Sequence, residues 1–327
     1  MKKSCFLILA LCAAGLFQGC ENSVTQKKLH LVFIGGTPDN YWSVVRLGCD
    51  FATRQVNDVD LDFRFLENGT PAAQQELLST LVTNGTDGIV ISPIDPATQT
   101  DFLNNLATNT LLVCADSDAE KSKRACYIGT DNVAAGMQAA ELLKAALPQG
   151  GKVILFAGYP NAENTQDRAQ GIRKGLAGSN IQIIDTLWDG TASEVAQKNA
   201  EDALMKHPDL AGMACLNGYQ GPAILTAVRQ AGKAGQVKIV CFEDYDKTMV
   251  GIAAGDIYGT IVQNPLKIGY QTIIRMDKYL RGDKTQFDNG KILIPSQRIT
   301  KDNLTDYLAV QRNQLLQTQA GTPGTGQ

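Results

Sequence analysis

The sequence predicts an α/β protein built from two similar, doubly wound parallel-sheet domains. Apolar runs of strand length alternate along the chain with amphipathic segments of helix length, and several runs, such as GIVI and LLVCA, are continuously apolar. Such strands, separated by helices, indicate a parallel sheet that is covered on both faces. The chain of 327 residues, 44% hydrophobic and 19% charged, is also too long for one compact core and suits two domains.

The expected strands fall into two groups of four. In the first half they read KLHLVFI, LDFRFL, DGIVIS and LLVCA, at 28–34, 61–66, 87–92 and 111–115. In the second half they read KVILFA, IQIIDTLW, LAGMACL and VKIVCF, at 152–157, 181–188, 210–216 and 237–242. The segments after matched strands also resemble one another, as in FLENGTPAAQQELL and LWDGTASEVAQKNA. Elements that recur in the same order predict two similar domains rather than one large sheet.

The two ends of the chain are expected to lie outside the fold. Residues 1–19 carry Lys2 and Lys3 and then an apolar run too short to span a bilayer, which predicts a cleaved export signal. Cys20 directly follows a glycine and resembles the acylated cysteine of a bacterial lipoprotein signal; an ordinary cleaved signal peptide is the alternative. Residues 20–27 would then form the lipid anchor and tether, and 311–327 a disordered tail.

Charge and composition argue against several classes of function. The formal charge of −3 becomes −5 once Lys2 and Lys3 are removed, which is a poor match for nucleic acid. Four of the five cysteines beyond Cys20 lie in strand-like runs, so buried free thiols are expected rather than disulfides. The sequence has no metal-binding His/Cys spacing and no GxGxxG, GxxxxGK[ST] or GxSxG motif. We therefore expect no cofactor, no metal and no enzymatic activity.

The loops after the matched strands form the expected ligand site, because open α/β sheets bind ligands at the carboxyl ends of their strands. The loops read GGTPDNYW, SPID and ADSD in the first half, and GYPNAENTQDR, WDGT, LNGYQ and FEDYD in the second. They contain both tryptophans, Trp42 and Trp188, and many acidic, amide and arginine side chains. A sugar ring needs this combination, since its C–H faces pack on aromatic rings while its hydroxyls pair with planar polar groups.

Ordered motifs give the chain a family resemblance over about residues 28–310. They are DNYW, DGIVISPID, IGTDN followed by AG, QDRAQGI, LNG and GTIVQNPLKIG. In this order they resemble the extracytoplasmic sugar-binding proteins of ABC importers, in the branch of the ribose-binding protein with its type I periplasmic-binding-protein fold. The resemblance implies an exported, lipid-anchored monomer. Such a protein captures a monosaccharide or related polyol in an interdomain cleft and delivers it to a membrane ABC permease.

The resemblance also implies a set of ligand-binding residues. They would supply carboxylates, amides, an arginine, a serine and aromatic faces, with Trp188 closing the face of the sugar opposite Tyr41 and Trp42. At two positions the chain departs from the pattern: Ser117 stands where Arg is common and Glu243 where Asp is usual, which leaves the sugar's identity open. The implied ligand contacts are Asp39, Tyr41, Trp42, Ser92, Asp116, Arg168, Trp188, Asn217, Glu243 and Gln263.

Family members cross between their domains three times, which by analogy predicts crossings near 130, 263 and 291. Domain one would comprise 28–130 plus 264–291, and domain two 131–263 plus 292–310. Asp116 and Glu243 are equivalent positions of the repeat, 127 residues apart, so each would enter the cleft from its own domain. A ligand that contacts both would shift the open form towards a closed one by hinge motion.

Simpler interpretations exist for some of these residues. Tyr41 and Trp42 are compatible with core packing at a helix start. Arg168 is compatible with pairing to Asp167 or Glu163 on a solvated helix face.

Other roles also stay open. Asp131 and Asn132 are interpreted as an N-terminal cap of the next helix rather than as a ligand site. Asp116 and Glu243, as paired acids, are compatible with glycosidase chemistry. A binder that presents its closed form to a chemoreceptor or sensor kinase is the alternative to an importer component.

Overall fold

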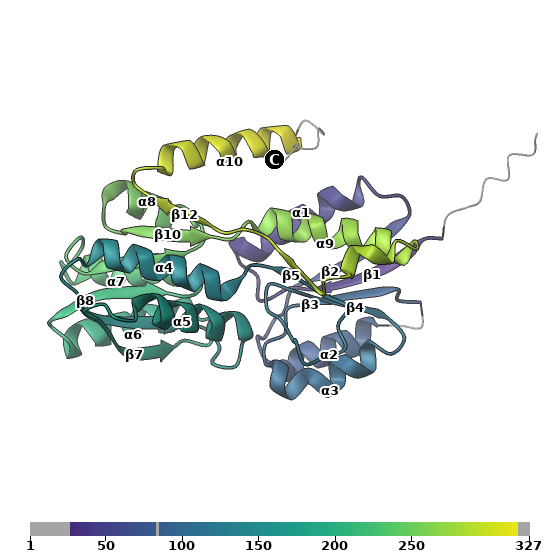
Figure 1. Ribbon diagram of the computed structural model, residues 1–327, viewed down its shortest axis with the longest axis horizontal. Helices are drawn as coiled ribbons and strands as arrows, with labels where there is room; N and C mark the ends of the chain where they lie inside the picture. Colours follow the sequence, from purple (N-terminus) through teal and green to yellow (C-terminus); the bar gives the residue numbers. More distant parts are fainter. Residues whose placement is uncertain (1–26, 83–84, 320–327) are drawn as a thin grey trace, which may run out of the picture.

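Two six-stranded sheets make up the computed structural model (Figure 1), which describes residues 27–82 and 85–319. The strand order is β11-β5-β4-β3-β1-β2 in the first sheet and β12-β10-β9-β8-β6-β7 in the second. Apart from the edge strands β11 and β12, the two sheets have the same topology: β1 to β5 are arranged in the first sheet as β6 to β10 are in the second. The repeat in the sequence is therefore also a repeat in strand order. Neighbouring strands run parallel, except β10 and β12. The predicted fold class, two doubly wound parallel-sheet domains, is confirmed.

The strands agree closely with the apolar runs of the sequence. The first sheet contains β1 (Leu29–Ile34), β2 (Val59–Arg64), β3 (Gly88–Ile91), β4 (Leu111–Ala115), β5 (Cys126–Gly129) and β11 (Lys291–Leu293). The second contains β6 (Gly151–Ala157), β7 (Ile181–Trp188), β8 (Leu210–Cys215), β9 (Lys238–Phe242), β10 (Gly259–Val262) and β12 (Gln297–Thr300). β5 was expected only as a strand-like run around Cys126, and β10, β11 and β12 were not among the expected strands; each of the four has only three or four residues.

Helices cover both faces of each sheet (Figure 1). Several begin at a side-chain cap, and at Asp131 the predicted cap is confirmed, because its Oδ1 accepts a hydrogen bond of 2.9 Å from the amide of Ala134. The helices are α1 (Asn40–Thr53), α2 (Pro71–Leu81), α3 (Pro96–Leu106), α4 (Asn132–Ala146), α5 (Glu163–Leu176), α6 (Ser193–Lys206), α7 (Gln220–Gln230), α8 (Asp246–Ala254), α9 (Pro265–Leu280), the short η1 (Lys284–Phe287) and α10 (Leu304–Gln319).

The C-terminal helix corrects one expectation. α10 continues to Gln319, past the expected end of the fold at 310 and into the segment expected to be disordered. The reason is local, since QRNQLLQTQ at 311–319 contains good helix formers and neither Gly nor Pro. The rest of the expected tail, 320–327, and the expected export signal with Cys20 lie outside the described residues. In the part of the chain that is described, no helix is both long and apolar enough to cross a bilayer.

The chain passes between the sheets at three places. After β5 of the first sheet, α4 packs against α5 of the second domain, and after β10 of the second sheet, α9 packs against α1 of the first (Figure 1). The third passage connects β11 to β12, and the expected boundary at 291 falls on the first residue of β11.

The two helix pairs made by these passages depend on glycine where the helices cross. A Cβ on Gly48 of α1 would lie 2.1 Å from the carbonyl oxygen of Leu266 in α9, and a Cβ on Gly269 would lie 2.0 Å from that of Val45. The α4–α5 pair is made in the same way at Gly136. Because the obstructing atoms belong to the backbone, any larger residue forces the helices apart.

We expect Gly269→Ala to lower the free energy of unfolding by about 1–3 kcal/mol, the usual cost of overpacking. A fall in stability would itself indicate a steric clash, because replacing Gly by Ala inside a helix otherwise raises stability by about 1 kcal/mol. Denaturant unfolding measures the change. Gly251→Ala in α8 is the matched control, since the nearest atom to its new Cβ is the movable Cδ1 of Ile257 at 2.8 Å. Equal losses in both variants would contradict the crossing argument.

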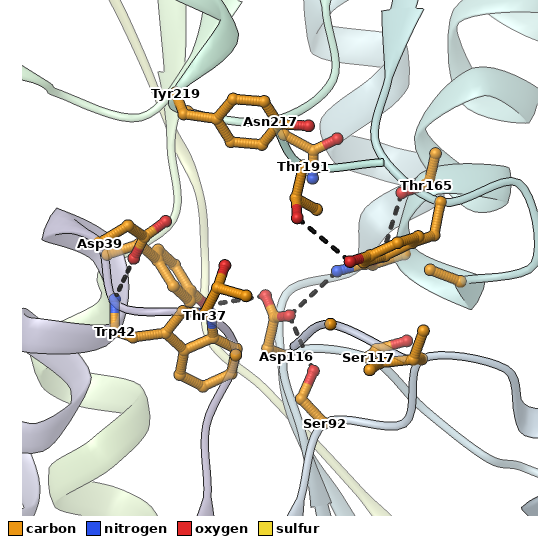
Figure 2. Close-up of a pocket in the computed structure, with 18 of the residues that line it drawn as sticks. Thr37, Asp39, Trp42, Ser92, Asp116, Ser117, Thr165, Thr191, Asn217 and Tyr219 are labelled. Carbon is orange, nitrogen blue, oxygen red and sulfur yellow. Dashed lines mark hydrogen bonds between the residues drawn. The ribbon is translucent and has the colours of Figure 1, made fainter. Parts of the chain in front are cut away.

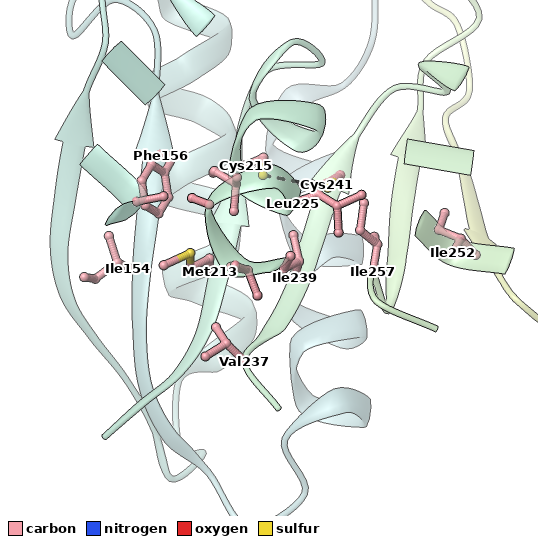
Figure 3. Close-up of a cluster of buried hydrophobic side chains, with 14 of the residues drawn as sticks. Ile154, Phe156, Met213, Cys215, Leu225, Val237, Ile239, Cys241, Ile252 and Ile257 are labelled. Atoms are coloured by element: carbon pink, nitrogen blue, oxygen red, sulfur yellow. Dashed lines mark hydrogen bonds between the residues drawn. The ribbon is translucent and has the colours of Figure 1, made fainter. Parts of the chain in front are cut away.

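The cores are apolar and include the cysteines. Cys215 of β8 and Cys241 of β9 lie side by side in one core cluster of the second domain, with their Sγ atoms 3.7 Å apart (Figure 3). The expectation of buried free thiols is confirmed for the described cysteines, which are Cys49, Cys114, Cys126, Cys215 and Cys241.

Candidate functional site

A cavity of about 120 Å³ lies between the two domains, at the carboxyl ends of their strands (Figure 2). Its walls come from the segments after β1 to β4 on one side and after β6 to β10 on the other. Its size is near that of a roughly 150 Å³ cavity that holds a single benzene ring. Nine of the ten sequence-predicted contacts line it: Asp39, Tyr41, Trp42, Ser92, Asp116, Arg168, Asn217, Glu243 and Gln263.

Asp116 is the central carboxylate of the first domain. It accepts hydrogen bonds from the Tyr41 hydroxyl at 2.9 Å, the Ser92 hydroxyl at 3.1 Å and Nδ2 of Asn164 at 3.0 Å. Asn164 belongs to α5, so the third bond joins the two domains across the cavity. Burial raises the pKa of Asp116, while the Arg168 charge and these hydrogen bonds oppose the rise.

Glu243 occupies the equivalent place in the second domain. Burial raises its pKa to about 8, although the charge of Arg168 and the hydrogen bond from Gln263 both lower it. Asp116 and Glu243 both have left-handed backbones, with φ of 66° and 65°. Non-glycine residues rarely adopt this conformation, and such strain gathers at functional sites. Its recurrence at matched positions therefore supports a shared role for the two acids.

Arg168 lies in the cavity wall and is only 2% exposed. Its Nη1 donates to the carbonyl oxygen of Leu216 at 2.7 Å, its Nε donates to Oδ1 of Asn132 at 2.9 Å, and its Cζ lies 4.5 Å from the ring centre of Phe242. Its burial is incompatible with a place on a solvated helix face. Nη2 is buried and has no hydrogen-bond partner among the described residues.

Two further residues that line the cavity, Ser117 and Gln263, have a buried side-chain oxygen without a hydrogen-bond partner among the described residues. Gln263, which follows β10, donates through Nε2 to Glu243. Its Oε1 is buried and has no partner within the described ranges. Buried polar atoms are normally paired, so the free donor of Arg168 and the free acceptor of Gln263 are exceptions among the described residues that need an explanation.

The aromatic pair of the first loop serves the core and the cavity together. Tyr41 and Trp42 are both buried, both line the cavity, and meet edge to face at 5.2 Å between ring centres. The Trp42 ring lies against Gly36, where a Cβ would come within 2.2 Å of Nε1. Tyr41 and Trp42 therefore pack in the core, as one interpretation predicts, and also line the cavity, as the other predicts.

Asp39 connects the first loop to the opposite domain. Its carboxylate caps α1 by accepting from the Trp42 amide at 2.8 Å, and it also accepts from the Tyr245 hydroxyl at 2.8 Å (Figure 2 shows the cap). Burial raises the pKa of Asp39, although the hydrogen bonds from the Trp42 amide and the Tyr245 hydroxyl both lower it. Further from the cavity centre, Nδ2 of Asn161 donates to Asp95 of the first domain at 2.9 Å. The domains are thus joined on both sides of the cavity.

The structure does not bring Trp188 into the cavity. Its side chain is 43% exposed, because it ends the edge strand β7 directly after Leu187, which packs on the core. Successive side chains of a strand point to opposite faces, so Trp188 faces away from that core. The expectation that Trp188 closes the cavity is therefore corrected, and Thr191 in the following turn lines the cavity instead.

Tyrosines supply the aromatic surface that was expected from Trp188. Tyr159, Tyr219 and Tyr245 line the cavity from the second domain, together with Asn164. The hydroxyl of Tyr159 hydrogen bonds with that of Thr191 at 3.2 Å. All four missed residues lie within loops that the repeat identified, but sequence alone does not say which side chains of a loop turn inward.

Comparison with known proteins finds similarity over most of the chain. A family model described as periplasmic binding protein domain matches residues 31–284, a range that includes the passages after β5 and β10. The ribose import binding protein RbsB of Escherichia coli is 24% identical over 243 residues, which are 72% of this chain and 80% of the relative. The xylitol-binding protein of Mycolicibacterium smegmatis is 22% identical over 279 residues, 80% of this chain and 75% of the relative.

Solved structures are similar over both domains. An ABC transporter solute-binding protein of Burkholderia graminis, in complex with D-arabinose, has a TM-score of 0.81 and 26% identity, covering 86% of this chain and 98% of its own. XylFII, solved in a complex with LytSN, has a TM-score of 0.78 and 25% identity, covering 84% of this chain and 98% of its own.

Proposed function

The chain belongs to the periplasmic binding protein domain family, and from this premise we propose that it captures a monosaccharide or related polyol in the cavity between its domains. The observation that carries the proposal is that residues lining the cavity have buried polar atoms without partners among the described residues, including the donor Nη2 of Arg168 and the acceptor Oε1 of Gln263. A hydroxyl group both donates and accepts, so a polyhydroxylated ring satisfies both atoms. The names of the relatives, which refer to ribose and xylitol, and the D-arabinose complex support a sugar-like ligand.

The proposed mechanism is capture by closure. The nine predicted residues that line the cavity contact the ligand, with Asp116 held in one domain and Arg168 and Glu243 in the other. A ligand that contacts both domains stabilises the closed form relative to the open one, and the closed form is delivered to an ABC importer. The protein acts outside the cytoplasm as a monomer. Its family consists of sugar-transport binding proteins rather than enzymes, which favours capture over glycosidase chemistry at the paired acids.

Calorimetry of the residue 21–327 protein against pentoses, hexoses and polyols tests the proposal. We expect at least one sugar to bind with 1:1 stoichiometry and, at 100 times its Kd, to raise the free energy of unfolding by about 2.7 kcal/mol. Tryptophan emission reports the same event, because Trp42 lines the cavity. The sugar is expected to be recovered unchanged. A broad panel that changes neither heat, melting temperature nor emission would contradict the sugar hypothesis.

We propose that Cys20 carries a lipid that holds the mature protein at the membrane surface. Cys20→Ser is expected to move the protein from the membrane fraction to the soluble exported fraction, because the acylated side chain is lost. Fractionation followed by immunoblotting measures the distribution. Cys12→Ser, within the expected cleaved signal, is the matched control and should leave the protein on the membrane. Membrane association that persists in Cys20→Ser would rule out this anchor.

A ligand-sensing role is the second candidate, and the similarity to XylFII in its complex with LytSN favours it. The two roles differ in which partner responds to the closed form. A stimulated ATPase activity of the cognate importer in vesicles, on adding sugar and protein together, supports transport. Sugar-dependent binding to the extracytoplasmic part of a sensor, without ATPase stimulation, supports sensing.

A further inference from the structure

We propose that Asn132 is a positioning residue for ligand binding, one that orients the Arg168 guanidinium so that Nη2 points at the ligand. The inference rests on the proposed function for its binding measurements, and it adds a residue that lies outside the cavity wall. The sequence assigned Asn132 only to a helix cap. In the structure, Asp131 makes that cap, which leaves the Asn132 side chain for another task.

The geometry around Arg168 leaves one orientation for its guanidinium group. Nε is held by Oδ1 of Asn132 at 2.9 Å and Nη1 by the carbonyl oxygen of Leu216 at 2.7 Å. Two bonds in different directions, with the Phe242 ring below, fix the plane of the group and direct Nη2. The Leu216 bond alone leaves the plane free to rotate about it, so the Asn132 bond decides where Nη2 points.

The Asn132 amide is itself oriented by its surroundings. Its Nδ2 lies 3.5 Å from the carbonyl oxygen of Asp116 and 3.4 Å from the hydroxyl of Tyr127, which donates to the same carbonyl oxygen at 3.0 Å. A guanidinium only donates and a carbonyl oxygen only accepts, so Oδ1 must face Arg168 and Nδ2 must face Asp116. Asn132 is 7% exposed, so its amide group is largely shielded from solvent.

The position of Asn132 in the chain determines which of its contacts lie within one domain and which join the two domains. It is the first residue of α4, directly after the passage from the first sheet to the second domain. α4 is packed tightly on α5, which carries Arg168, as the close approach at Gly136 requires. The bond to Arg168 therefore lies within one domain, whereas the contacts to Asp116 and Tyr127 join it to the other. The contacts of Nδ2, at 3.5 and 3.4 Å, are longer and weaker than the bond between Oδ1 and Arg168 at 2.9 Å.

A double-mutant cycle on ligand affinity tests the inference. Asn132→Ala is expected to weaken sugar binding by about 10-fold, since a hydrogen bond to a charged group is lost from the arrangement that presents Nη2. In an Arg168→Ala background the same change should have no further effect, because Asn132 acts through Arg168. Asn132→Asp restores the acceptor for Nε but not the donor towards the Asp116 carbonyl, and it should recover part of the affinity that Asn132→Ala loses. Additive losses, or no rescue by Asp, would overturn the inference.

A ligand-free measurement separates this inference from the proposed function. In ¹⁵N NMR spectra, the Arg168 Nε–H signal, assigned by its loss in Arg168→Lys, should shift in Asn132→Ala and return near its place in Asn132→Asp. Asp131→Ala is the matched control: it removes the α4 cap and lowers the melting temperature, but should leave this signal and the affinity unchanged. An unmoved signal in Asn132→Ala overturns the positioning role. Absence of sugar binding by the wild type, with the signal shifted as expected, overturns only the proposed function.

Discussion

Arg168→Ala is expected to weaken sugar binding by about 10- to 100-fold, the effect of losing a hydrogen bond from a charged donor. Nη2 is buried and unpaired among the described residues, so a bound hydroxyl becomes its partner. In the wild type, the positive charge of Arg168 lowers the pKa values of Asp116 and Glu243 and so opposes the effect of burial. Removing that charge therefore raises both pKa values further. Both consequences disfavour the closed, liganded form.

Calorimetry on the variant measures the loss, and far-UV circular dichroism checks the fold. Arg168→Met separates charge from volume, because it refills the space above Phe242 without a donor and should bind as weakly as the Ala variant. Arg173→Ala is the matched control on the same helix, where the side chain is exposed and Nη2 donates to Thr186 at 3.2 Å. If Arg168→Ala keeps wild-type affinity, Arg168 does not contact the ligand and the cavity needs another explanation.

Glu243→Gln is expected to remove a large part of the pH dependence of stability. Burial raises the pKa of Glu243 from 4.5 to about 8 in the folded protein, so folding favours the protonated acid. The resulting stabilisation is fully present below pH 4.5 and is lost as the pH rises to about 8. Wild-type stability should therefore fall across this window by several kcal/mol, since each pKa unit corresponds to about 1.4 kcal/mol. The Gln variant, which cannot ionise there, should fall less.

Denaturant unfolding without sugar at pH 5 and pH 8.5 measures the difference. Burial raises the pKa values of Asp39 and Asp116 too, and these acids contribute in the same direction in both proteins, so the comparison isolates Glu243. Glu194→Gln, on the exposed face of α6, is the matched control and should follow the wild type. Identical pH profiles for wild type and Glu243→Gln would show that the acid is ionised in the folded protein across the whole range.

The sequence predicted the architecture because the physics of a covered parallel strand is local. Eight apolar runs became strands, and β5 coincides with the strand-like run ACYIG around Cys126, whereas the residues of β10 were considered only as part of the motif GTIVQNPLKIG. The repeat then located the loops that line the cavity, since equivalent strands end at the same edge of each sheet. Asp116 and Glu243 lie directly after strands β4 and β9, where the backbone leaves little choice of direction.

Side-chain direction inside longer loops was not predictable in this way. Trp188 was assigned to the cavity from its residue type, yet it ends the edge strand β7 on the face opposite Leu187, where it is 43% exposed and does not line the cavity. Tyr159, Tyr219 and Tyr245 had no distinguishing pattern in the sequence. Their contribution depends on how the domains meet, which neither half of the sequence contains alone.

The exchange of α4 and α9 between the domains has a consequence for how the molecule comes apart. A fragment that ended after β5 would keep α1 but lose α9, and its exposed groove at Gly48 would have no helix to fill it. The complementary fragment would keep α9 without the helix it packs on. Consecutive halves of the chain are therefore not expected to be autonomous folding units, because each domain takes one helix of a tightly packed pair from beyond a passage between the sheets.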